Sequence, residues 1–418
     1  MNTAARRKVP LLPFILITSL FFMWGLANNM TDTLLAAFKK IMSMTDTRTS
    51  LIQIAFYGSY FMLALPAAIL IKKFTYKTGI LLGLAMYIAG CLLFYPAAHT
   101  ANYFHYLAAL YILAGGCSIL ETASNPYIIT MGPEETGTRR LNLAQSFNPI
   151  GSITGILLSQ TFILSHLNAA SADERAVMTI EELKSIQAVE LNAVTMTYVW
   201  VGVILIGIWI MIAITRMPKA SDEGNGIELG PTIKRLFSNR HYSWGVISQF
   251  FYVGAQIGVW SFTIRYVMQE LQLNEEQSAS YYLGAIILFT LARFINTFLM
   301  RYFKPRNLLT ASAIGAIVCT SIVIFGEGLT AVYALVAISG FMSLMFPTIY
   351  GLSLRGLGTD TKIGGSFLIM AILGGAVITF IQGQVSDLTG SIKYAYFVPM
   401  VCFVIIAAYG QMKFAGQE

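Results

Sequence analysis

Apolar segments long enough to cross a lipid bilayer recur along almost the whole chain of 418 residues. A transmembrane helix takes about 20 consecutive apolar residues. Twelve such segments occur, at residues 12–38, 49–71, 78–98, 103–131, 140–165, 194–215, 242–268, 278–300, 307–326, 329–354, 363–386 and 394–413. Because lipid offers no hydrogen-bond partner to an open backbone, the sequence predicts an all-α membrane protein with twelve transmembrane helices.

The small share of charged residues excludes a soluble protein. Only 11% of the residues are charged and 56% are hydrophobic, whereas soluble domains carry about 25% charged residues. A basic cluster precedes the first apolar segment, as in a signal peptide. That segment is longer than the apolar region of a signal peptide and no A-x-A site follows it, so we expect it to remain as the first transmembrane helix.

The lysines and arginines gather in the loops on one side of the predicted membrane. With the N-terminus placed in the cytoplasm, the inner segments hold 19 of them and the outer segments hold 6. Cytoplasmic loops of membrane proteins carry such an excess. The distribution therefore predicts that both termini are cytoplasmic, and it explains the net charge of +7 without a nucleic-acid partner.

A weak internal repeat indicates two related halves. Pro126 and the pair Gly137-Thr138 recur 221 residues later as Pro347 and Gly358-Thr359, and a Ser-Phe pair follows in each case. Parallel six-helix halves around a site near the midplane are the layout of the major facilitator fold. Two connections are long, at 166–193, where 180–190 could form a short helix, and at 216–240. We therefore predict an N-terminal six-helix bundle (1–215), a cytoplasmic linker (216–240) and a C-terminal six-helix bundle (241–418).

Two acidic residues lie well inside predicted helices, Asp32 in the outer half of the first and Glu121 in the fourth. A charged side chain at the bilayer centre costs roughly 2.5–3.5 kcal/mol on insertion scales, so each is a functional-site hypothesis. An apolar environment disfavours the ionised form of a carboxyl group. Asp32 and Glu121 are therefore predicted to bind and release protons. The alternative for each is a packing residue satisfied by an arginine or an asparagine.

Two arginines also lie within the predicted spans. Arg293 is in the eighth helix, where it could be a structural charge partner or a ligand for the transported solute. Arg265 is near the end of the seventh helix, from which a long side chain can reach the membrane interface; a functional role is the alternative.

Amide side chains recur on single faces of two predicted helices. They are Asn142, Gln145 and Asn148 in the fifth helix, and Gln249 and Gln256 in the seventh, followed by Trp260. Amides donate and accept hydrogen bonds, as sugar hydroxyl groups require, and an aromatic ring can stack on the apolar face of a sugar. The alternative is hydrogen bonding between helices. These two helix faces with their amide side chains predict a binding site for a small polar solute such as a sugar.

Motifs of ATP-driven transport and of soluble enzymes are absent from the sequence. It has no Walker A loop, no serine-nucleophile elbow and no H-E-x-x-H zinc motif. The four cysteines lie in apolar segments and lack the spacing of metal ligands, so we interpret them as packing residues. They are Cys91, Cys117, Cys319 and Cys402. We therefore expect neither an enzyme nor a metal site, and no cofactor other than a coupling proton.

Four stretches resemble the bacterial L-fucose/proton symporter family of the major facilitator superfamily. They are FFMWGLANNMTD at 21–32, LETASNP at 120–126, RLNLAQSFN at 140–148 and YVGAQ at 252–256. The resemblance extends over nearly the whole chain, and these motifs are specific to fucose, glucose/galactose and related hexose porters. It implies that Asp32 and Glu121 couple transport to protons, with Glu121 close to the sugar. The sugar-binding candidates are Glu121, Asn28, Asn29, Asn125, Gln145, Asn148, Gln256, Trp260 and Phe346.

One departure from this family concerns the choice of sugar. Where the family has Tyr-Pro-Thr-Ile in the tenth helix, this chain has Phe346-Pro347-Thr348-Ile349 and lacks the hydroxyl group. The resemblance implies proton-coupled import of L-fucose or a related hexose by alternating access, through a monomer in a bacterial inner membrane. Uptake of glucose/galactose or of N-acetylglucosamine, and a sugar sensor that does not transport, remain alternatives.

Overall fold

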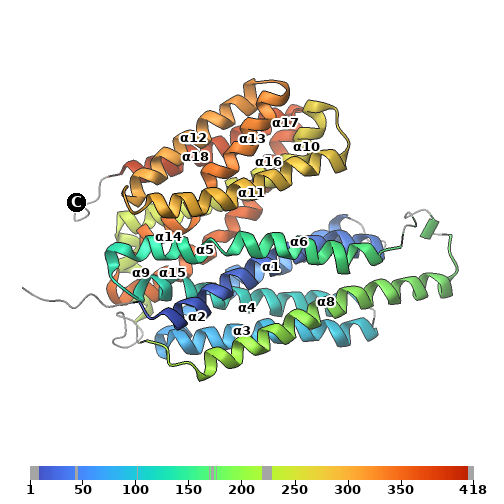
Figure 1. Ribbon diagram of the computed structural model, residues 1–418, viewed down its shortest axis with the longest axis horizontal. Coiled ribbons are helices and arrows are strands. Elements are labelled where there is room, and N and C mark those ends of the chain that lie inside the picture. The colour runs from blue at the N-terminus through green and yellow to red at the C-terminus, as the bar shows by residue number, and fades with distance from the viewer. Residues whose placement is uncertain are drawn as a thin grey trace, which may run out of the picture. The chain divides into compact units, whose positions relative to one another are not determined.

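The computed structural model describes residues 9–42, 46–100, 102–168, 170, 174–175, 177–218 and 228–412. Within 31–40, 46–50, 53 and 275–276 it describes the backbone alone. All regular secondary structure in these ranges is helical (Figure 1).

Most predicted spans are single helices. They are α1 (Leu11–Ile41), α2 (Asp46–Lys73), α3 (Tyr76–Thr100), α4 (Tyr103–Thr130), α8 (Ile180–Ile214), α10 (Arg240–Leu271), α11 (Glu275–Leu299) and α12 (Pro305–Phe325). Eleven segments of the described chain are long and apolar enough to cross a membrane. The remaining predicted span is α10, a helix of 32 residues, whose glutamines Gln249 and Gln256 lower its mean hydropathy.

Other predicted spans are interrupted. The fifth span consists of α5 (Gly137–Gln145) and α6 (Asn148–Phe162), and the tenth consists of α13 (Gly328–Met342) and α14 (Met345–Leu354). The eleventh span consists of α15 (Thr361–Met370), η4 (Ala371–Leu373) and α16 (Gly374–Thr389). The twelfth span consists of α17 (Ile392–Ala395) and α18 (Phe397–Gln411). Single 3₁₀ turns precede α5 and α15 and follow α6; these are η1 (Glu134–Thr136), η3 (Gly358–Asp360) and η2 (Leu164–His166). The described part of the predicted linker forms α9 (Leu229–Ser238).

The sixth span begins earlier than expected. The sequence predicts a short helix at 180–190 and a separate span at 194–215, but α8 is one helix of 35 residues. Thr179 caps its first turn in a reciprocal capping box with Glu182, an arrangement that satisfies two backbone donors. At 1.5 Å per residue, α8 is about 52 Å long, which exceeds the roughly 30 Å hydrocarbon core.

The described residues form two compact units. The α1 unit comprises Pro10–Ser124 and Phe147–Pro218. The α10 unit comprises Asn125–Ser146 and Lys219–Glu418, together with Met1–Val9, as far as these ranges are described. The α10 unit therefore includes α5 and the end of α4, which the sequence-based division assigns to the N-terminal bundle. The division into 1–215 and 241–418 stays a prediction.

Glycines allow α1 and α6 to pack closely in the α1 unit. A Cβ atom at Gly25 would overlap the carbonyl oxygen of Asn148, and one at Gly151 would overlap that of Phe22. Small residues serve this purpose in membrane helices because they let the two backbones approach.

This packing predicts a position-dependent effect of alanine. We expect Gly151→Ala to lower the midpoint of thermal unfolding in detergent by about 3 °C or more, because overpacking costs about 1–3 kcal/mol. Gly207→Ala is the matched control, since a Cβ there meets no atom within 4 Å and alanine favours a helix. Equal midpoints for the two variants would contradict the close approach of α1 and α6.

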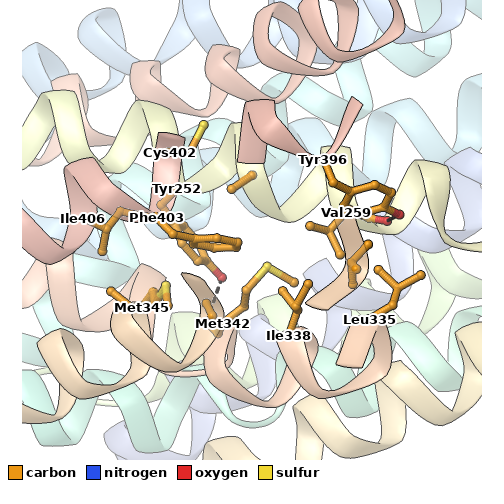
Figure 2. Close-up of a cluster of buried hydrophobic side chains, with 14 of the residues drawn as sticks. Tyr252, Val259, Leu335, Ile338, Met342, Met345, Tyr396, Cys402, Phe403 and Ile406 are labelled. Carbon is orange, nitrogen blue, oxygen red and sulfur yellow. Dashed lines mark hydrogen bonds between the residues drawn. The ribbon is translucent and has the colours of Figure 1, made fainter. Parts of the chain in front are cut away.

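The α10 unit has a continuous apolar core (Figure 2). Figure 2 shows Tyr252 and Val259 of α10 among side chains of α13 (Leu335, Ile338 and Met342) and α18 (Cys402, Phe403 and Ile406). The Tyr252 hydroxyl donates to the Met342 carbonyl oxygen at 3.1 Å. Because Met342 is the last residue of α13, this bond fixes the end of α13 against α10.

Candidate functional site

Glu121 of α4 is a buried carboxyl group inside the α1 unit. Its side chain is 1% exposed and lies beside the Tyr60 hydroxyl of α2, which in turn lies beside the Trp24 indole of α1. Glu121 Oε2, Tyr60 Oη and Trp24 Nε1 are all buried and make no hydrogen bond of good geometry within the described chain, although Tyr60 interacts with both of the other groups. Buried polar atoms are normally hydrogen-bonded, so this cluster has unused capacity to bind a polar ligand.

Other oxygen atoms of the same unit are also buried and without a partner in the described part of the chain. Asn28 Oδ1 on α1, and Thr122 Oγ1 and Ser124 Oγ on α4, are buried and have no hydrogen-bond partner among the described residues. The described ion pairs are Arg175–Glu190, Arg235–Asp360 and Lys393–Glu270, so no described base neutralises Glu121.

The other candidates of the α1 unit are Asp32, Asn29 and Asn148. Asp32 belongs to α1, but its side chain lies outside the described residues. Asn29 Nδ2 donates to the Gly25 carbonyl oxygen at 3.3 Å, and Asn148 Nδ2 donates to the Phe21 carbonyl oxygen at 3.3 Å. Asn148 therefore helps to join α6 to α1.

A pair of amides lies inside the α10 unit. Gln145 at the end of α5 donates from Nε2 to Asn125 Oδ1 on α4 at 2.9 Å. Both side chains are buried, and Asn125 Nδ2 has no partner in the described structure. The three amides predicted on the fifth helix do not lie on one continuous helix, because a turn at 146–147 separates Gln145 from Asn148.

Asn142 makes a contact that sequence reasoning missed. Its Nδ2 donates to the hydroxyl oxygen of Thr348 on α14 at 3.2 Å, and both residues are buried. Neither the spacing nor the composition indicates this pair. Tyr60 was missed for a similar reason, since a tyrosine in an apolar helix resembles a packing residue.

The remaining candidates of the α10 unit are half-buried. Trp260 Nε1 donates to Ser339 Oγ at 3.1 Å, and its ring meets Phe289 edge-on at 5.0 Å between centroids. The Phe346 ring lies 6.3 Å from that of Tyr350 in a stacked arrangement. Gln256 precedes Trp260 by one helical turn, so the two side chains share a face of α10.

Arg293 of α11 is buried and is held by backbone carbonyl groups. Its Nε donates to the Ser343 carbonyl oxygen at 2.5 Å, and Nη1 donates to that of Gln145 at 2.9 Å. The guanidinium carbon lies 4.5 Å from the centre of the Phe289 ring. Arg265 is exposed and stacks on Phe262 at 4.9 Å, which agrees with a residue near a helix end.

These features define a multi-pass α-helical membrane protein with buried polar groups suited to a small polar solute. The family model for the Major Facilitator Superfamily matches residues 14–379. The chain is 39% identical to the L-fucose-proton symporter of Haemophilus influenzae over 98% of both chains. It is 34% identical to the glucose/galactose transporter of Brucella abortus, with 94% of this chain and 92% of that one covered.

A solved structure agrees with these relatives. The crystal structure of the E. coli fucose:proton symporter FucP matches with a TM-score of 0.90 and 37% identity, covering 97% of this chain and 99% of that one. The chain therefore belongs to the Major Facilitator Superfamily. The predicted fold class and family are confirmed, and members of this superfamily are secondary transporters, not enzymes.

Proposed function

We propose that this protein imports a monosaccharide, L-fucose or a related hexose, together with protons across a bacterial inner membrane. The observation that carries the proposal is the buried Glu121 carboxyl group beside Tyr60 and Trp24. Similarity to an L-fucose-proton symporter and to a glucose/galactose transporter supports the same substrate class.

Protonation of Glu121 changes what this carboxyl group offers to a sugar. An ionised carboxylate only accepts hydrogen bonds, whereas the neutral acid also donates one. Burial disfavours the ionised form, and a sugar that binds the neutral form more tightly promotes proton uptake by reciprocal linkage. We assign to Asp32 a second proton-binding role in the outer half of α1.

The sugar contacts are assigned to amides, the Glu121 carboxyl group and two aromatic rings. In the α10 unit the contacts are Asn125, Gln145, Gln256, Trp260 and Phe346; in the α1 unit they are Asn28, Asn29, Asn148 and Glu121. Transport then follows alternating access, in which the halves 1–215 and 241–418 move about the linker 216–240. We keep a monomer with both termini in the cytoplasm as part of this proposal.

A competition panel on counterflow tests the substrate class. Purified protein in liposomes loaded with unlabelled sugar is given labelled sugar outside. L-Fucose, D-galactose, D-glucose and N-acetylglucosamine serve in turn as the label, and the other sugars or a pentitol are the competitors. We expect one of the hexoses to compete and the pentitol to have no effect. Binding without counterflow would identify a sensor and would overturn transport.

Phe346 gives a second test, of sugar choice. We expect Phe346→Tyr to raise the competitiveness of L-fucose over D-galactose about tenfold, which corresponds to one added hydrogen bond. The same panel measures it. An unchanged order of sugars in Phe346→Tyr would remove Phe346 from the sugar contacts.

A further inference from the structure

Arg293 is a buried cation whose surroundings are neutral. Its side chain is 3% exposed, and the ion pairs within the described chain do not include it. Burying an arginine is costly unless its donors are satisfied. The two carbonyl oxygens that receive its hydrogen bonds, those of Gln145 and Ser343, therefore need an explanation.

Prolines leave both of these carbonyl groups without their usual helical partner. In an α-helix the carbonyl of residue i accepts from the N–H of residue i+4. Four residues after Gln145 is Pro149, and four residues after Ser343 is Pro347. Proline has no N–H, so each carbonyl is free to accept from Arg293.

Both carbonyl groups also lie at the carboxyl end of a helix. Gln145 is the last residue of α5, and Ser343 follows directly on α13. The carboxyl end of a helix carries a partial negative charge that attracts a cation. Arg293 thus meets two helix ends of favourable polarity, and the planar guanidinium group can serve both at once.

The side chain of Gln145 is fixed by the same arrangement. Its backbone oxygen accepts from Arg293 Nη1 at 2.9 Å, while its side-chain Nε2 donates to Asn125 Oδ1 at 2.9 Å. Movement of the end of α5 would therefore displace the amide pair.

We propose that Arg293 is a positioning residue that holds the breaks of the fifth and tenth spans and thereby orients the Gln145–Asn125 amide pair for the sugar. The orientation of the pair for a sugar rests on the proposed function. The holding of the two breaks does not, and it can be measured without any sugar.

The test compares Arg293→Met, Arg293→Lys and the control Arg265→Met in the full-length protein in detergent. Sugar affinity is measured with the competing hexose, and deuterium uptake with peptides that cover 140–150 and 340–350. For Arg293→Met we expect about tenfold weaker binding and faster exchange at both breaks, with α3 unchanged. Arg293→Lys keeps the positive charge but loses the planar guanidinium group that can donate to both carbonyl oxygens, so its affinity should lie between those of Arg293→Met and the wild type. Arg265→Met should change neither readout.

A compensating variant guards against a simple loss of folding. Pro149→Ala returns an N–H donor that can satisfy the Gln145 carbonyl. Combined with Arg293→Met, it should restore slow exchange at 140–150 and part of the affinity. The corresponding Pro347→Ala combination should restore slow exchange at 340–350.

The results that would overturn the proposal are distinct. Unchanged exchange at both breaks in Arg293→Met would reject the holding role, and faster exchange throughout the protein would indicate a general structural role instead. Faster exchange at the breaks with unchanged affinity would reject the orientation of the amide pair. If the wild-type protein bound no sugar, the proposed function would fail, and the exchange pattern alone would decide whether Arg293 holds the two breaks.

Discussion

Replacing Glu121 with glutamine should abolish sugar accumulation driven by a pH gradient and leave counterflow measurable. Glutamine keeps the size and hydrogen-bonding ability of the neutral acid but cannot bind a proton. With one proton per sugar, a pH difference of one unit supports about tenfold accumulation. Proteoliposomes with wild-type protein should approach this ratio, whereas those with Glu121→Gln should stop near equal concentrations inside and outside.

Two further variants serve as a control and as a test of the second proposed proton site. Glu181→Gln makes the same chemical change at an exposed position of α8 and should accumulate sugar as the wild type does. Asp32→Asn tests the second proposed proton site in the same assay. Sustained accumulation by Glu121→Gln on a pH gradient would show that the proton is carried elsewhere.

Removing the Glu190 side chain should destabilise the fold more than Gly151→Ala does. Glu190 on α8 pairs with Arg175 through two hydrogen bonds, from Nη2 to Oε1 at 2.5 Å and from Nη1 to Oε2 at 3.0 Å. Both side chains are 1% exposed, and the Asn168 N–H also donates to Glu190 Oε1 at 2.8 Å. Glu190→Ala leaves a buried arginine unpaired, which costs about 3 kcal/mol or more.

A double variant distinguishes the net contribution of the ion pair from the cost of leaving one buried charge without its partner. Arg175→Met combined with Glu190→Met removes both charges and keeps the apolar volume, and such replacements are often close to neutral. We expect its thermal midpoint in detergent to lie near that of the wild type and several degrees above that of Glu190→Ala. A midpoint for Glu190→Ala equal to that of an exposed control, Glu181→Ala, would show that the Arg175–Glu190 pair does not stabilise the fold.

The membrane spans were predictable because hydrocarbon thickness imposes a minimum length on every apolar segment that crosses the bilayer. The predicted span 103–131 corresponds to α4 (Tyr103–Thr130), and 307–326 corresponds to α12 (Pro305–Phe325). The continuity of α8 was harder to predict. The sequence indicates a short helix at 180–190, whose first turn has the capping-box spacing of Thr179 and Glu182, but the charged and polar composition of the 166–193 connection is typical of a loop and hides the fact that this helix continues into the span 194–215.

The helix breaks were harder to predict, because they depend on a residue far away in sequence. Pro149 and Pro347 weaken their helices wherever they occur, but proline-containing helices also continue, as α4 does through Pro126. What distinguishes the two breaks is Arg293, which binds the freed carbonyl groups. Glu121 was predictable because a single acid in an apolar helix is conspicuous, whereas Tyr60 beside it gives no such signal.

The coupling of sugar to protons is tested most directly by the pH of the medium when sugar is added to energy-depleted proteoliposomes. With a lightly buffered exterior and no imposed gradient, inward sugar movement should carry protons inward, so the exterior should become alkaline. Glu121→Gln should abolish this change while sugar exchange continues. Sugar entry into wild-type vesicles with no change in external pH, or with acidification, would contradict proton symport.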